Sequence, residues 1–152
     1  MALLTPRALA PIIALSLAAA FPARADEPIG QIKTETGQVS VQRSGATAPL
    51  KIGDHVFRSD TIVTAAGSSV GLTFADNSLM SLGPASRLRL DQFQFDKTTH
   101  KGLFDTALEK GTLAVKSGQI VRQTPGAMHV RTPAALLGVR GTEFVVRAGD
   151  GA

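Results

Sequence analysis

Apolar and polar residues alternate in short runs along this chain, with turn residues between the runs. The alternation is clearest around Val39, from Val70 to Phe74 and from Leu113 to Lys116. Successive side chains of a β-strand point to opposite faces, so each run would turn one apolar face toward a core. Glycine, proline, aspartate and asparagine recur roughly every ten residues, as they do between short strands. The pattern predicts an all-β domain.

This rhythm, without regularly spaced helical segments, predicts about nine to eleven strands in an antiparallel sandwich, a jelly-roll-like pair of sheets or a short β-roll. It argues against parallel β-α-β units. Residues 75–78, Ala-Asp-Asn-Ser, predict a hairpin turn, because Asp and Asn tolerate the left-handed backbone conformation. Leu103 to Lys110 has tolerable helical spacing, but Gly102 and Gly111 would limit a helix to about two turns, and we expect a strand.

One run departs from regular alternation. Leu88 and Leu90 occupy one parity, whereas Phe93 and Phe95 occupy the other. In a regular strand the two pairs would lie on opposite faces of the sheet. One extra residue near Asp91-Gln92 would bring all four side chains to the same face, so the sequence predicts a β-bulge there.

The first 25 residues resemble a targeting segment. An apolar run from Ala8 to Phe21 is followed by Ala23-Arg24-Ala25, which fits the small-x-small pattern that signal peptidase cleaves. The run contains Pro11 and is shorter than the roughly 20 apolar residues that cross a bilayer. We expect residues 1–25 to be a signal peptide and residues 26–152 to be a single domain. The mature protein would then be periplasmic or secreted, with no transmembrane segment.

Composition narrows the range of functions. The chain has no cysteine, which excludes disulfides and a lipoprotein anchor. The formal net charge is +4, and basic and acidic residues are interleaved, which is typical of a solvated face and argues against a nucleic-acid partner. There is neither Trp nor Tyr, the residue types that commonly stack on sugars and anchor interfaces. Binding should therefore depend on backbone edges and polar loops.

Two patterns are candidates for chemistry. Gly67-Ser68-Ser69-Val70-Gly71 matches the G-x-S-x-G pattern of serine hydrolases, in which the serine lies between a strand and a helix. Here an alternating strand follows Ser69 directly, so a small hydrolase is the least favoured function. His55, His100 and His129 lack the close spacing typical of metal ligands, and we expect the first and third to point outward from strands. We predict no catalytic residue, no metal site and no cofactor.

The run from Met128 to Val146, MHVRTPAALLGVRGTEFVV, combines two strands, a proline-marked corner and an Arg-Gly-Thr turn. Within it, Arg140-Gly141-Thr142-Glu143-Phe144, preceded by Thr132-Pro133-Ala134, resembles the signature of the FecR domain, a bacterial envelope module. The resemblance covers roughly Ile32 to Val146. Other fragments follow in the expected order: Gly37-Gln38-Val39, Gly53-Asp54-His55-Val56, Asp60-Thr61-Ile62-Val63-Thr64, Phe74-Ala75-Asp76-Asn77-Ser78, Pro84-Ala85-Ser86 and Gly111-Thr112-Leu113.

The resemblance implies a role in envelope signalling. Many similar proteins combine a cytoplasmic region that controls an alternative sigma factor, a membrane helix and a periplasmic FecR domain that receives a signal from an outer-membrane transporter. This chain resembles only the exported domain, so we do not expect direct control of a sigma factor. We expect a non-enzymatic sensing or protein-interaction module that binds another envelope protein. The alternative is a structural or scaffold protein of the envelope.

Turn chemistry accounts for the motif residues. Gly141 would adopt a backbone conformation closed to other residues, and Thr142 would hydrogen-bond locally. The planar fork of Arg140 would hold neighbouring carbonyls or an acid such as Asp54 or Asp76. We therefore expect the motif to specify the fold first, with a partner contact as its second role.

The end of the sequence suggests where a partner binds. Gly149-Asp150-Gly151 has the residues of a hairpin turn, but no returning strand follows. We expect Glu143 to Arg147 to be left as an edge strand, whose unpaired amides and carbonyls another strand can complete. Either the chain lacks its last strands as a fragment of a longer gene product, or a partner supplies a strand. The oligomeric state is left open.

Overall fold

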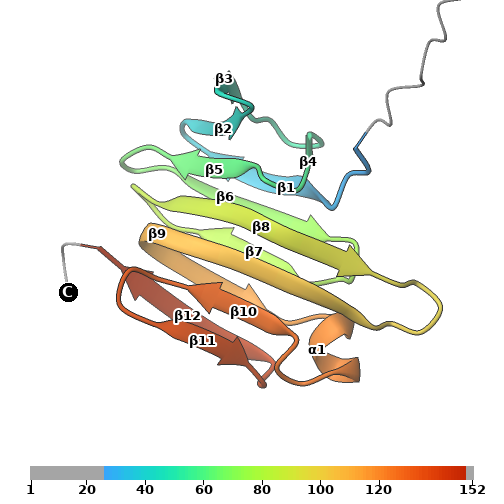
Figure 1. The fold of residues 1–152 in the computed structure, drawn as a ribbon. Helices are drawn as coiled ribbons and strands as arrows, with labels where there is room; N and C mark the ends of the chain where they lie inside the picture. The colour runs from blue at the N-terminus through green and yellow to red at the C-terminus, as the bar shows by residue number, and fades with distance from the viewer. Residues whose placement is uncertain (1–25, 150–152) are drawn as a thin grey trace, which may run out of the picture.

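The computed structural model describes residues 26–149. Its strands form one continuous β-sheet, which is curled so that two layers face each other (Figure 1). The predicted all-β class is confirmed, with 12 strands where about nine to eleven were expected. The expected signal peptide, residues 1–25, lies outside the described residues. The elements are β1 (Gly30–Thr36), β2 (Val39–Arg43), β3 (Ala46–Pro49), β4 (His55–Val56), β5 (Thr61–Thr64), β6 (Ser69–Phe74), β7 (Leu79–Leu82), β8 (Arg87–Phe95), β9 (Gly102–Lys116), α1 (Gln119–Gln123), β10 (Met128–Arg131), β11 (Leu136–Val139) and β12 (Glu143–Ala148).

Strand β9 belongs to both layers. Its first part, as far as Lys110, pairs with β8 and β10, and its second part, from Gly111 onward, pairs with β7 and β12. Layer A therefore has the strand order β4-β1-β6-β7-β9-β12, and layer B has the order β3-β2-β5-β8-β9-β10-β11. The change of layer occurs at Gly111, where φ is +93°. Leu103 to Lys110 is a strand, as predicted.

One connection differs from the expected antiparallel pattern. After β9 the chain forms the short helix α1 and returns as β10, which pairs with the first part of β9 in parallel. The described sheet is otherwise antiparallel, as expected, and this β9-α1-β10 unit is a local parallel exception. Ile120 and Val121 of the helix are buried, but five residues are too few to show a helical period in the sequence.

The predicted bulge in β8 is confirmed. The register between β8 and β9 shifts between Leu90 and Gln92. As a result Leu88 and Leu90 are fully buried, Phe93 is 6% exposed, and Phe95 packs against the same core from its rim. A regular strand would have directed the two phenylalanines to solvent.

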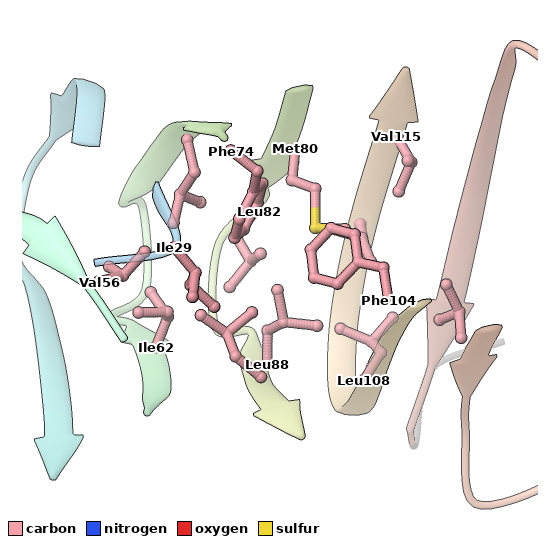
Figure 2. Packing of buried hydrophobic residues seen from close by; sticks show 14 of the residues in the cluster. Ile29, Val56, Ile62, Phe74, Met80, Leu82, Leu88, Phe104, Leu108 and Val115 are labelled. Carbon is pink, nitrogen blue, oxygen red and sulfur yellow. The ribbon is translucent and has the colours of Figure 1, made fainter. Parts of the chain in front are cut away.

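The core lies between the two layers and is formed almost entirely by aliphatic and phenylalanine side chains (Figure 2). Its aromatic centre joins both layers: Phe104 of β9 lies with its ring centroid 4.7 Å from that of Phe74 in β6 and 4.9 Å from that of Phe93 in β8. Both contacts have the edge-to-face geometry that aromatic rings favour. The layers are therefore held together by packing, in a chain that has no cysteine.

The predicted hairpin joins β6 to β7, and its turn positions the helix. Asn77 has φ +67°, and the buried carboxylate of Asp76 accepts hydrogen bonds from the backbone N–H (3.0 Å) and the hydroxyl (2.8 Å) of Ser78. The same turn receives the start of α1. Gly118 donates its N–H to the Ser78 hydroxyl at 3.0 Å, and Gln119 donates its N–H to the Asp76 carbonyl at 2.8 Å. A loop of layer A thus fixes the path that leads to β10.

Candidate partner-binding edge

The Arg-Gly-Thr motif forms the connection between β11 and β12. Its side chains are exposed, and two of its backbone carbonyls accept hydrogen bonds from the residue that follows β9. Ser117, which is buried, donates its hydroxyl to the carbonyl of Gly141 (2.7 Å) and its backbone N–H to the carbonyl of Thr142 (2.7 Å). The first residue of β12, Glu143, is thereby held opposite Lys116. Ser117 lies far from the motif in sequence, and no local pattern indicated it.

The conformational role predicted for Gly141 is wrong. Its φ is not in the left-handed region, and a Cβ placed on it would meet no atom within 4 Å. Thr142 hydrogen-bonds through its carbonyl, with Ser117 as donor. The turn is thus held from outside, by the end of β9, and does not depend on a special backbone conformation within the motif.

The predicted clamp by Arg140 is also wrong. Its guanidinium makes no hydrogen bond or ion pair within residues 26–149. The carboxylates proposed for it have other donors: Asp54 accepts the backbone N–H of Lys51 at 2.8 Å, and Asp76 is buried in its own hairpin turn. Arg140 is exposed beside β12, where its charge is available to a partner.

The expected edge strand is present. Within the described part of the chain, β12 pairs with β9 alone, so its other side carries no neighbouring strand. Phe144 and Val146 point inward and contribute to the core, the first half-buried and the second buried. Glu143, Val145 and Arg147 point outward and are exposed. An exposed edge of this kind is a template for the addition of another strand.

The hydrogen bonds between β9 and β12 determine which backbone N–H and C=O groups of β12 point toward β9 and which point away from it. Thr142 stands opposite Ser117 when the β9–β12 register is continued by one residue, and the two are joined by a backbone hydrogen bond. In an antiparallel ladder such hydrogen-bonded pairs alternate with pairs whose N–H and C=O groups point the other way. The peptide groups of Glu143, Val145 and Arg147 therefore point away from β9, toward the open side.

The hydrogen bonds between β9 and β7 lead to the same assignment of backbone groups. Gly83 donates its N–H to the carbonyl of Thr112 at 2.9 Å, so Thr112 and every second residue after it bond toward β7. The intervening residues, which include Val115 and Ser117, bond toward β12. This agrees with the hydrogen bond between Ser117 and Thr142.

A shallow apolar groove of about 420 Å³ runs beside the edge on the outer face of layer A. Leu79 of β7, Ala114 of β9 and Val145 of β12 line it, and Leu79 and Val145 are 44% and 67% exposed. The ion pair between Lys116 and Glu143, with N and O atoms 3.5 Å apart, borders the groove. Exposed aliphatic side chains flanked by charges suit an extended polypeptide better than a small polar ligand.

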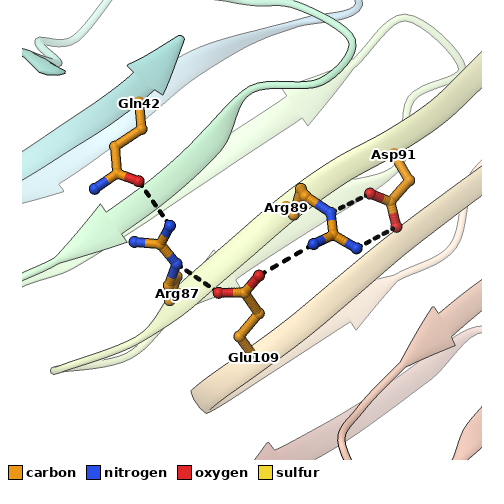
Figure 3. A network of polar contacts seen from close by, with 5 residues as sticks. All are labelled: Gln42, Arg87, Arg89, Asp91 and Glu109. Atoms are coloured by element: carbon orange, nitrogen blue, oxygen red, sulfur yellow. Dashed lines mark hydrogen bonds and ion pairs between the residues drawn. The ribbon is translucent and has the colours of Figure 1, made fainter. Parts of the chain in front are cut away.

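On the outer face of layer B, five polar side chains of β2, β8 and β9 contact one another (Figure 3). The carboxylate of Glu109 accepts hydrogen bonds from Arg87 (2.5 Å) and Arg89 (3.2 Å), and Arg87 also donates to Gln42 (2.6 Å). Arg89 also binds Asp91, and this hydrogen bond together with the nearby negative charge raises the pKa of the Arg89 guanidinium. These five side chains satisfy one another, so this part of the face offers few free groups to a ligand.

The other candidate residues lie apart. Ser69 is exposed at the start of β6 and is followed by strand, as expected, with no helix after it. His55 and His129 stand on outward positions next to buried valines, as predicted, and His129 Nδ1 lies 2.8 Å from a carboxylate oxygen of Asp105. No group of three or more His, Cys, Asp or Glu side chains within residues 26–149 is placed to hold a metal ion.

The hydroxyl of Ser117 should contribute measurably to the motif's position. We predict that Ser117→Ala lowers the free energy of unfolding by about 1 kcal/mol, because a hydrogen bond from a buried hydroxyl is lost. Ser81→Ala, on an exposed position of β7 with no side-chain hydrogen bond, should change it by less than about 0.5 kcal/mol. Urea unfolding measures both. Equal effects would show that the Ser117 hydroxyl does not help to hold the turn.

Comparison with known proteins identifies the family to which this chain belongs. A family model described as FecR protein matches residues 60–152, more than half of the chain. No curated protein and no solved structure gives a significant match. Among the described residues, no helix has the length and apolarity to span a membrane. The matched region contains β12 and the whole Arg140 to Phe144 motif, and the chain belongs to the FecR family.

Proposed function

We propose that this protein is a non-enzymatic sensing and protein-interaction module of bacterial envelope signalling, located in the periplasm or secreted. It binds an extended segment of another envelope protein along β12. The observation that carries the proposal is the open side of β12, where the peptide groups of Glu143, Val145 and Arg147 lack a neighbouring strand within the described chain.

Two features support this function. FecR domains typically take part in envelope signalling, and the family match includes the edge. Strand addition derives its affinity from main-chain hydrogen bonds and its specificity from the alternating side chains around them. Here the alternating outward side chains are Glu143, Val145 and Arg147, with exposed Arg140 near the start of the strand. This arrangement offers a backbone ladder and charges without any catalytic group.

Site-specific cross-linking tests the proposed edge. A photo-reactive amino acid at Val145 of β12 should form an adduct with an envelope protein in the producing cell. The same amino acid at Ala48 of β3, an exposed position on the edge strand at the opposite end of layer B, should not. The proposal fails if position 145 gives no adduct with another protein, or if both positions give the same one.

The signalling role is tested by changing the edge without changing the fold. Val145→Lys places a charge on an exposed edge position, a change that natural edge strands use to prevent pairing. We expect it to abolish the cross-link introduced at neighbouring Arg147 and to reproduce the transcript changes of a gene deletion. A deletion strain with an unchanged transcript profile would favour the scaffold alternative instead.

Gly141→Ala separates folding from binding within the motif. Because an added Cβ meets no atom within 4 Å, the free energy of unfolding should stay within about 0.5 kcal/mol of wild type. If the same variant loses the adduct at position 145, the motif contributes to partner binding. A strongly destabilised Gly141→Ala protein would instead assign the motif a role in folding alone.

The proposed location is tested by the mature N-terminus. Mass spectrometry of the protein from an envelope or medium fraction should find Asp26 as the first residue, since the Ala23-Arg24-Ala25 pattern ends there. Recovery of the intact chain from the cytosol, beginning at Met1, would contradict an exported protein.

A further inference from the structure

The outward residues of β12 form a self-complementary series. Glu143 and Arg147 carry opposite charges and lie at equal distances on either side of Val145, on the same outer face. An antiparallel copy of this strand presents the same residues in reverse order. Reversal about Val145 therefore places acid against base and valine against valine.

We propose that β12 of one molecule pairs antiparallel with β12 of a second copy, about a two-fold axis at Val145. This inference rests on the proposed function, in which β12 is the docking edge, and it names a second copy of the chain as an occupant of that edge. In this register Glu143 faces Arg147 of the second copy, and Arg147 faces its Glu143. Opposite charges directly across an antiparallel pair are stabilising.

The direction of the backbone N–H and C=O groups in β12 permits this register. Glu143, Val145 and Arg147 are the residues whose peptide groups point away from β9, and the register sets them opposite one another as hydrogen-bonded pairs. Three such pairs give about six hydrogen bonds. A shift by two residues would set Glu143 or Arg147 against Val145, and a larger shift would set like charges together. Charge and backbone therefore select the same register.

The faces of the extended sheet are also compatible. On the inner side, half-buried Phe144 would face Val146 of the second copy, which would cover more of the phenylalanine ring. On the outer side, the two Val145 side chains, each 67% exposed in the single molecule, would contact each other. The apolar groove lined by Leu79 and Ala114 would then continue across the axis.

The contact is short, so the dimer should be weak and exchangeable. Six residues of strand extend about 20 Å, which is small for an interface that is stable at low concentration. One edge holds only one added strand at a time. A dimer would therefore compete with the strand of an envelope partner, and partner binding would release the second copy.

Charge reversal tests the pairing in sedimentation experiments on the purified protein. We expect reversible dimerisation at concentrations up to about 1 mM, the range in which weak contacts are populated. Arg147→Glu should weaken it at least about tenfold, because two acid–base pairs become acid–acid pairs. Adding Glu143→Arg to that variant restores opposite charges and should return the dissociation constant to within about threefold of wild type. Arg131→Glu on β10, an interior strand of layer B, has the same net charge change and should have little effect.

Three results would overturn the dimer: a monomer at every concentration, an equal loss with Arg131→Glu and Arg147→Glu, or no recovery in the double variant. Failure here is separable from failure of the proposed function. A monomer that still forms the position 145 adduct with another envelope protein refutes the dimer and leaves the docking edge in place. A dimer whose edge forms no such adduct in cells supports the pairing and refutes the proposed function.

Discussion

Gly111→Ala should lower the free energy of unfolding by about 4 kcal/mol or more, a loss that is exceptional for a single substitution. Gly111 has φ +93°, a left-handed conformation that costs other residues about 1–2 kcal/mol. A Cβ there would lie 2.0 Å from the Ser86 hydroxyl oxygen and 2.5 Å from the Ser86 Cα. Ser86 is fully buried, so its backbone has little room to move. Strand β9 would lose the bend that carries it from layer B to layer A.

Gly138→Ala is the matched control. Gly138 is also a strand glycine, but its φ is not in the left-handed region and an added Cβ would meet no atom within 4 Å. Alanine is favoured over glycine in regular structure by roughly 0.5–1 kcal/mol, so stability should stay the same or rise slightly. Thermal and urea unfolding compare the two variants. Similar stabilities would mean that β9 does not bend at Gly111 as described.

Phe104→Ala should cost about 3–5 kcal/mol, the usual range for removing a fully buried phenylalanine. Phe104 has no exposed surface, and Figure 2 shows it in the core together with Phe74. Its ring contacts Phe74 and Phe93 edge to face at centroid distances of 4.7 and 4.9 Å. Truncation removes both contacts and leaves a cavity between the layers. The backbone hydrogen bonds of β9 remain after this substitution, but they do not replace the lost side-chain packing.

Phe104→Leu is the conservative comparison for this site. Leucine keeps most of the buried apolar volume, so the loss should be well under half of that for alanine. Unfolding in urea, analysed with a common slope, measures the difference between the two variants. If alanine and leucine cost the same small amount, the three phenylalanines do not form the centre of the core.

Much of the fold follows from local pattern. Side-chain alternation predicts strands such as β6, and the parity change between Leu90 and Phe93 predicts the bulge, because one face of each strand must be apolar. Asp76 and Asn77 predict the hairpin because their backbone preferences are local. These features depend on residues close together in the sequence.

Other features depend on distant residues. Gly111 looks like a strand boundary in the sequence, yet β9 continues through it for 15 residues in all. Its path is defined by Ser86 and by four partner strands, β8 and β10 before Gly111 and β7 and β12 from Gly111 onward. The parallel return through α1 depends on Asp76 and Ser78, which receive the start of the helix. No pattern within residues 117–124 contains that information.

The candidate site divides in the same way. The strand that follows the Arg-Gly-Thr turn could be expected from the sequence, and its edge position follows from its pairing with β9 alone within the described residues. The roles assigned to Arg140 and Gly141 were wrong, because motif chemistry alone does not reveal that Ser117 holds the turn. The register between β9 and β12 must be known before one can say which peptide groups of β12 face outward. The proposed pairing between two copies of β12 depends on the same register. The strand is thus evident from local pattern, whereas its hydrogen bonding depends on residues far away in the sequence.

The domain can be understood as a packed support for the exposed edge at β12. Five polar side chains on the outer face of layer B pair with one another, and the core between the layers is continuous. Strand β12 is anchored in the core by Phe144 and Val146, and its backbone has no paired strand on the edge away from β9 within the described residues. A rigid edge loses little conformational entropy when a second strand is added, which favours recognition through the backbone.

Residue-resolved amide hydrogen exchange along β12 tests the central claim, that this strand is an open docking edge, most directly. In dilute protein the amides of Glu143, Val145 and Arg147 should exchange rapidly, whereas those of Phe144 and Val146, which bond toward β9, should be protected. Raising the concentration into the dimer range, or adding the cross-linked partner, should slow the first three selectively. Uniform exchange along the strand, or an alternating pattern that neither addition changes, would contradict the account.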